Sequence, residues 1–215
     1  MKISWLVPLA LFAVACGAVD SASTDDALQK NTNAYAGAYK SPSIVRDGAT
    51  YHAYFAQTTL TVNGGKKNFN VPHATFDDKD VWTKPHEALP KLGKDADPNG
   101  PVWAPAAAKI GPSHWMLYYT AQLAGHGEKK CIWRAHAPSG DGPFVDDYNG
   151  PLVCPDASEW ALDAYVVQDM HDRWVLGMRY DTGNGINTIR IRQLDAQGTH
   201  FEPGSSFMEL TQNHQ

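Results

Sequence analysis

The sequence predicts an all-β protein, and an internal repeat carries that prediction. Three segments about 60 residues apart share one order: a small-residue or proline turn, an apolar strand, a polar turn and an aromatic strand. Turn signals rich in Gly, Asn and Asp recur roughly every 10–20 residues, which leaves room for short strands and almost no helix. A strand-only repeat of about 40–60 residues is typical of a β-propeller blade, so we expect three blades of four strands each.

The elements follow this order along the chain. The first two strands of the three repeats read SPSIV and YHAYF at 41–45 and 51–55, WAPAA and HWMLYY at 103–107 and 114–119, and LDAYVV and RWVLGM at 162–167 and 173–178. The first blade is expected to continue at 70–74, with a solvated DDKD turn at 77–80. The second continues at 131–136 and ends at 142–144, and the third runs through 187–194 and 201–203.

The first 18 residues are expected to be a secretory signal peptide. Lys2 gives the positive start, residues 6–15 form a short apolar run, and Cys16 opens a small-residue cleavage region. A rival interpretation is a lipoprotein signal in which Cys16 is acylated. Residues 19–37 are polar, small and aperiodic, which predicts a linker. The partial propeller is then 38–215, and a fourth blade would be expected to begin where the sequence stops.

The composition narrows the classes of binding partner that the chain can have. A net charge of −5 argues against nucleic acid, and no polybasic or amphipathic helical segment indicates a membrane surface. Seven Trp and nine Tyr suit sugar binding by ring stacking, although blade cores use the same residues. The histidines lack the ligand spacing of zinc sites, and there is neither a phosphate loop nor a nucleophile elbow, so no metal or cofactor is expected.

Two cysteines remain once the signal is removed, Cys131 and Cys154. An even count in an oxidising compartment predicts a disulfide between them. Closing that loop would restrain the unfolded chain by roughly 3 kcal/mol. Two buried free thiols are the alternative.

Three short motifs carry a resemblance to a known family. SPSIVRDGATY at 41–51 resembles the first-blade segment of glycoside hydrolase family 43, usually DPSI followed by a Gly turn and TYY. VWAP at 102–105 is similar to the second-blade VWAPD of that family, and LDA at 162–164 stands where the family has IDP. The matches cover about 38–207 in order and at blade spacing. LVCP at 152–155, together with Cys131, resembles secreted fungal members.

The resemblance implies a secreted, five-bladed propeller that acts on arabinan, arabinoxylan or xylo-oligosaccharides of the plant cell wall with inversion. An inverting enzyme needs a base to activate water and an acid to protonate the leaving oxygen, with the two carboxyl groups roughly 6.5–9.5 Å apart. The family adds a third carboxylate that holds the pKa and orientation of the acid. Inner strands of successive blades converge on the axis, which lets residues about 60 positions apart meet at one sugar.

The departures from the family pattern predict impaired catalysis. Ser41 occupies the base position, where a hydroxyl cannot accept a proton from water as a carboxylate does. Asp47 falls at the far end of the strand and does not replace it. Asp163 matches the pKa-modulating carboxylate, against the alternative of a surface-turn Asp. Ala106 and Ala164 replace the Asp after WAP and the Pro of IDP.

The remaining candidates are weaker. The acid Glu of the family belongs to a fourth blade, and Glu209 comes too early in the chain to be that residue. Trp103 and Tyr165 are expected to bind substrate, with blade core as the alternative for Trp103. Glu159 is a further candidate, as a partner of Asp163, and His73 and His126 are candidates for residues that line the axis. For each of the three, the alternative is an ordinary loop residue.

Three hypotheses follow: a hydrolase or a fragment of one, a non-catalytic sugar-binding relative, and a secreted interaction protein on the same scaffold. Three blades would leave two exposed sheet edges, so we expect the chain to aggregate or to oligomerise. The oligomeric state itself is not predicted.

Overall fold

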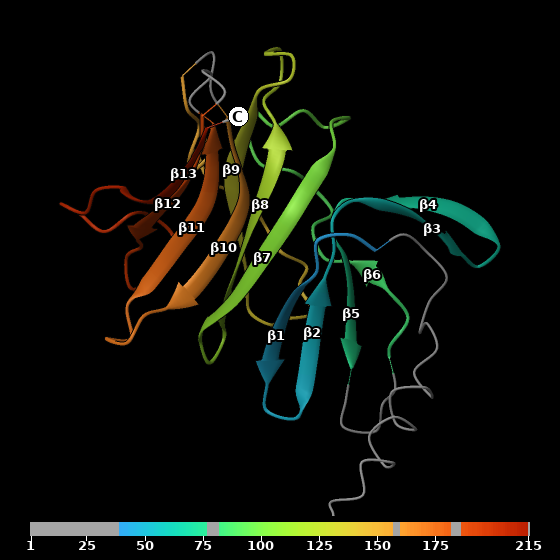
Figure 1. Ribbon diagram of the computed structural model, residues 1–215. Coiled ribbons are helices and arrows are strands. Elements are labelled where there is room, and N and C mark those ends of the chain that lie inside the picture. Colours follow the sequence, from blue (N-terminus) through green and yellow to red (C-terminus); the bar gives the residue numbers. More distant parts are fainter. Residues whose placement is uncertain (1–38, 77–81, 157–159, 182–185, 215) are drawn as a thin grey trace, which may run out of the picture. The chain divides into compact units, whose positions relative to one another are not determined.

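The computed structural model describes residues 39–76, 82–156, 160–181 and 186–214, and every regular element among them is a β-strand. The predicted signal peptide, the linker and the turn at 77–80 lie outside the described residues. The strands form three antiparallel blades and one separate hairpin (Figure 1). No described segment is a helix long and apolar enough to cross a membrane.

The first blade has the order β1-β2-β5-β6. Its strands are β1 (Ser43–Asp47), β2 (Thr50–Tyr54), β5 (Pro72–Phe76) and β6 (His86–Glu87). Gly48 makes the turn between β1 and β2 with a φ of 61°, a conformation that glycine adopts without steric cost. The hairpin of β3 (Thr58–Val62) and β4 (Gly65–Phe69) is inserted between β2 and β5 and was not predicted from the sequence.

The second blade has three strands, so the prediction of four is wrong here. They are β7 (Val102–Gly111), β8 (His114–Gln122) and β9 (Lys130–Ala137), in that order. Two isolated bridges, Ile132 to Val153 and His136 to Val145, stand at the free edge of β9 in place of a fourth strand. Prolines at 143, 151 and 155 interrupt this segment, and proline cannot donate a ladder hydrogen bond.

The third blade has the order β10-β11-β12-β13. Its strands are β10 (Trp160–Gln168), β11 (Trp174–Asp181), β12 (Ile186–Gln193) and β13 (Met208–His214). The fourth strand is therefore β13 and not the predicted 201–203, which contributes only a bridge from Phe201 to Leu194.

Strand β8 is buried on both faces and separates two hydrophobic cores. Because side chains alternate along a strand, Trp115, Leu117 and Tyr119 pack in the core shared with the first blade. Met116 and Tyr118 pack in the core shared with the third blade. The second blade is thus fixed between its two neighbours.

Cys131 on β9 is fully buried and forms a disulfide with Cys154, with their Cα atoms 4.6 Å apart. This confirms the predicted pairing. The disulfide holds the segment that follows β9 beside that strand, next to the bridge between Ile132 and Val153.

Candidate functional site

The first strands of the three blades meet at one cleft. Strand β7 contacts both β1 and β10, and the three run side by side (Figure 1). The cleft has a volume of about 490 Å³ and is lined by residues 41–44, 104–107 and 163–167. These are the segments in which the repeat and the family motifs were recognised, so the structure brings the three motifs together.

The three segments share a backbone feature that the sequence did not reveal. Ser41, Ala104 and Asp163 have positive φ angles of 48°, 40° and 57°. The register of β7 shifts between Trp103 and Ala106, and that of β10 shifts between Leu162 and Tyr165, so both strands bulge at this point. Bulges re-aim side chains near functional sites. Ala104 is therefore the second-blade counterpart of Ser41 and Asp163.

Asp163 presents an exposed side chain to the cleft, while its backbone N–H donates to Oγ1 of Thr120 on β8 at 3.2 Å. Partial desolvation raises the pKa of the Asp163 carboxyl above its ordinary value, and the positive charge of Arg179 opposes this shift. A carboxyl with a raised pKa suits proton exchange or hydrogen bonding to hydroxyl groups.

Ser41 brings only a hydroxyl to the same cleft. Asp163 is the one carboxylate among the described residues that line it. Asp47 lies at the other end of β1, where its Oδ1 accepts from Nζ of Lys109 at 2.6 Å. Glu209 lies on β13, where its Oε2 is 3.6 Å from Nε of Arg190. Neither residue lines the cleft, and Glu159 lies outside the described residues.

The two predicted aromatic contacts differ in position. Tyr165 lines the cleft and is 63% exposed, so its ring is available to a ligand. Trp103 is half-buried and is not among the lining residues. Nζ of Lys130 lies 5.4 Å from the ring centre of Trp103 and 5.7 Å from that of Trp160. The guanidinium of Arg179 lies 4.8 Å from the ring centre of Trp160. This row of rings and cations was not predicted from the sequence.

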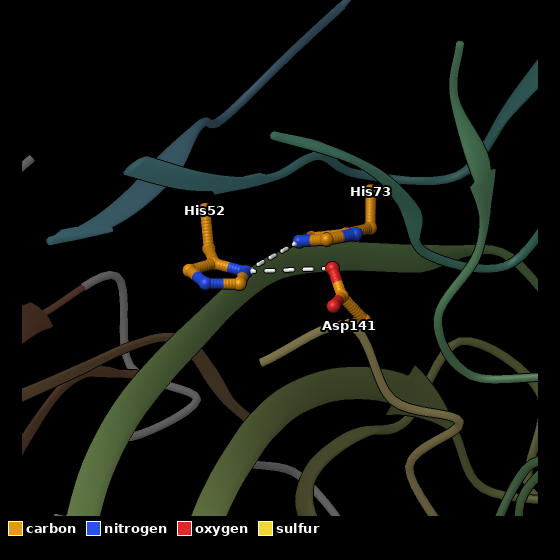
Figure 2. Close-up of side chains that lie close together, drawn as sticks. All are labelled: His52, His73 and Asp141. Carbon is orange, nitrogen blue, oxygen red and sulfur yellow. Dashed lines mark hydrogen bonds and ion pairs between the residues drawn. The ribbon is translucent and has the colours of Figure 1, made fainter. Parts of the chain in front are cut away.

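The histidines proposed for the axis do not line the cleft. His126 is exposed in the loop between β8 and β9. His73 is fully buried in the first blade, where it lies beside His52 and Asp141 (Figure 2). Ligand spacing along the chain gave no sign of this cluster, because its members come from two strands and a distant loop.

Comparisons with known proteins agree with the fold and the motifs. The family described as "Glycosyl hydrolases family 43" matches residues 33–212. Among solved structures, an endo-arabinase from Bacteroides thetaiotaomicron has a TM-score of 0.59 at 17% identity, covering 80% of this chain and 56% of that one. An α-L-arabinofuranosidase from Clostridium thermocellum has a TM-score of 0.59 at 22% identity, covering 79% and 56%.

A third structure, an α-L-arabinanase from Cellvibrio cellulosa complexed with arabinohexaose, has a TM-score of 0.58 at 15% identity, with coverage of 80% and 53%. No curated protein sequence matches the chain. The chain thus spans little more than half the length of these solved structures. The expected all-β fold, an incomplete propeller of the five-bladed type, is confirmed. Since the family match covers most of the sequence and the three motifs meet in one cleft, the chain belongs to glycosyl hydrolase family 43.

Proposed function

We propose that this chain is a secreted protein that binds arabinan-type chains of plant cell walls in the cleft between β1, β7 and β10, and that its hydrolysis of glycosidic bonds is impaired. One observation carries the proposal: the cleft holds the carboxylate of Asp163 but only the hydroxyl of Ser41 where the family places its base. Inverting hydrolysis needs a carboxylate to activate water, and a serine hydroxyl does not supply one near neutral pH.

The lining of the cleft supports sugar binding. An exposed aromatic ring at Tyr165 offers an apolar face for stacking, and Asp163 offers hydrogen-bond acceptors to sugar hydroxyls. Two of the solved structures described above are named as an endo-arabinase and as an α-L-arabinanase complexed with arabinohexaose, which makes an arabinose chain the first ligand to test. The disulfide between Cys131 and Cys154 supports a secreted location, because such bonds persist in oxidising compartments.

Binding and hydrolysis are tested separately on the full chain. Isothermal titration with arabino-oligosaccharides is expected to show binding, and cello-oligosaccharides serve as the control ligand. Asp163→Asn and Tyr165→Ala are expected to weaken binding, whereas Met170→Ala, a change at an exposed turn outside the cleft, is expected to leave it unchanged. Equal heats for all four proteins would contradict a sugar site in the cleft.

Long incubation with arabinan, followed by analysis of released sugars, is expected to give no product above background. Release that disappears in Asp163→Asn would show that the chain is an active hydrolase and that the assignment of Ser41 as a lost base is wrong. Fractionation of a culture that expresses the chain with its own N-terminus tests secretion, and retention in the cells would contradict it.

A further inference from the structure

A second group of polar side chains lies between the first and second blades, and none of its members lines the cleft. His52 on β2 and His73 on β5 are diagonal neighbours on one face of the first blade, because Tyr54 pairs directly with His73. Asp141 reaches them from the loop that follows β9 (Figure 2). The first blade thus supplies two imidazoles, and the second supplies one carboxylate.

The distances suit a single small cation. Nδ1 of His52 lies 3.1 Å from Nε2 of His73 and 3.8 Å from Oδ1 of Asp141, and the three ligand atoms all lie within 4.8 Å of one another. Two imidazole nitrogens bound to one tetrahedral zinc ion lie about 3.3 Å apart, given Zn–N bonds of about 2.0–2.1 Å. The histidine pair already has this spacing. The carboxylate belongs to an exposed side chain that can close the remaining gap.

The two ring nitrogens lie against the loop that carries Asp141. His52 and His73 are buried, whereas the side chain of Asp141 is 62% exposed. Gly140 approaches so closely that a Cβ atom there would lie 2.6 Å from Nδ1 of His52. The hydroxyl of Tyr54 donates to the carbonyl of Gly140 at 2.6 Å and holds this loop in place. A side chain at position 140 would therefore clash with the imidazole of His52, and glycine avoids this clash.

We propose that His52, His73 and Asp141 form a binding site for a divalent transition-metal ion of the zinc class, with water as the fourth ligand. Two imidazoles and one carboxylate are a donor set typical of zinc and other first-row ions, whereas calcium and magnesium prefer oxygen ligands. Because the ligands come from two blades, the bound ion joins the first blade to the loop of the second.

His86 is the positioning residue of this site. Its Nε2 lies 3.3 Å from Nδ1 of His73 and 2.9 Å from the carbonyl oxygen of Asp141. When Nε2 of His73 binds the ion, the proton of that ring resides on Nδ1, and Nε2 of His86 accepts it in the tautomer that gives up donation to the carbonyl oxygen of Asp141. Such contacts from the outer shell orient a ligating histidine and fix its tautomer.

The test uses the full chain, stripped of metal with a chelator and titrated with Zn²⁺ alone. One Zn²⁺ per chain is expected to bind at this site and to raise the melting temperature, because an ion that binds only the folded state stabilises it. With Co²⁺ alone, the absorption spectrum is expected to show the intense visible bands of tetrahedral coordination. His52→Gln is expected to abolish both signals, and His86→Gln to weaken binding about 10–100-fold.

The surface variant Asp141→Asn guards against a folding defect, because it changes an exposed loop residue, and near-ultraviolet circular dichroism of the metal-free proteins checks their folds. Asp141→Asn is expected to weaken Zn²⁺ binding and to change the Co²⁺ spectrum. His171→Gln, a change in an exposed histidine 3.9 Å from Asp169, is the matched control and is expected to bind as the wild type does. Wild-type Zn²⁺ binding in Asp141→Asn, or no tight binding by the wild type itself, would overturn the proposal.

Discussion

Ser41 and Asp163 share one left-handed backbone conformation, with φ angles of 48° and 57°, and they line the same cleft from the first and third blades. Ala104 repeats the conformation in the second blade with a φ of 40°. For residues other than glycine this region costs roughly 1–2 kcal/mol. The blades therefore have in common a strained backbone conformation at the cleft and not one type of side chain.

Replacing Ala104 by glycine tests this strain. Ala104→Gly removes the Cβ that makes a positive φ unfavourable, which offsets the entropy lost by fixing a glycine, about 0.5–1 kcal/mol. We expect the free energy of unfolding to stay unchanged or to rise by up to about 1 kcal/mol. Ala106→Gly, at a buried strand position nearby, is the control and is expected to lower it by about 0.5–1 kcal/mol. Urea denaturation compares the two, and equal losses would contradict the strain.

The raised pKa of Asp163 predicts a pH-dependent effect of Asp163→Asn. Because the folded protein holds this proton more tightly than the unfolded chain does, the stability of the wild type falls as the pH rises from the unfolded pKa of about 3.9 through the higher folded pKa. Asparagine cannot ionise and tolerates positive φ. We therefore expect the variant to be the more stable protein at pH 7, with a difference that shrinks below pH 4.

Denaturant unfolding of both proteins across this pH range measures that difference. Met170→Ala, a change at an exposed residue that carries no ionisable group, is the control and is expected to give no such trend. A difference for Asp163→Asn that is constant with pH would show that the carboxyl is not desolvated in the cleft.

Removal of the disulfide is expected to destabilise the protein by about 3 kcal/mol, because the unfolded chain regains the freedom of the loop that Cys131 and Cys154 close. Thermal melts with and without a reductant measure the effect. In the double variant Cys131→Ala and Cys154→Ala, the reductant is expected to change nothing further. A melting temperature of the wild type that is insensitive to full reduction would contradict this prediction.

The third blade exposes an apolar face formed by Tyr165, Val167, Ile189 and Leu210, which line a hollow of about 550 Å³. Exposed apolar patches of this kind favour association. We expect concentration-dependent self-association of the chain in sedimentation velocity, reduced by Leu210→Lys. Met170→Lys places the same charge on an exposed apolar residue outside this face and serves as the control. A monodisperse monomer at all concentrations would refute the expectation.

The repeat predicted the first two strands of every blade because each is a run of apolar or aromatic residues bounded by turn signals. SPSIV at 41–45 and LDAYVV at 162–167, for example, overlap β1 and β10. The hairpin of β3 and β4 was missed although an Asn-Gly turn marks its tip, since β4 is exposed apart from Phe69 and carries no apolar alternation. The fourth strand of the third blade was misplaced because Phe201 forms a bridge without continuing into a strand.

The cleft and the proposed metal site also differ in how far the sequence could predict them. Ser41 and Asp163 could be placed together because the resemblance assigns each to the start of an inner strand, but the bulge of β10 at Asp163 depends on strand register, which the sequence does not give. His52, His73 and Asp141 could not be placed together, because their contact depends on the packing of two blades. No local spacing records such a contact between distant segments.

Ser41, Ala104 and Asp163 share a positive φ angle although their side chains differ in chemistry. A hydroxyl, a methyl group and a carboxylate occupy equivalent points of the three blades, so the scaffold does not depend on which of them is present. A single codon change at any of these points could remove or restore a reactive group without rebuilding the scaffold. Loss of reactivity in this family would then leave almost no trace in the shape of the protein, and only the side chains facing the cleft would record it.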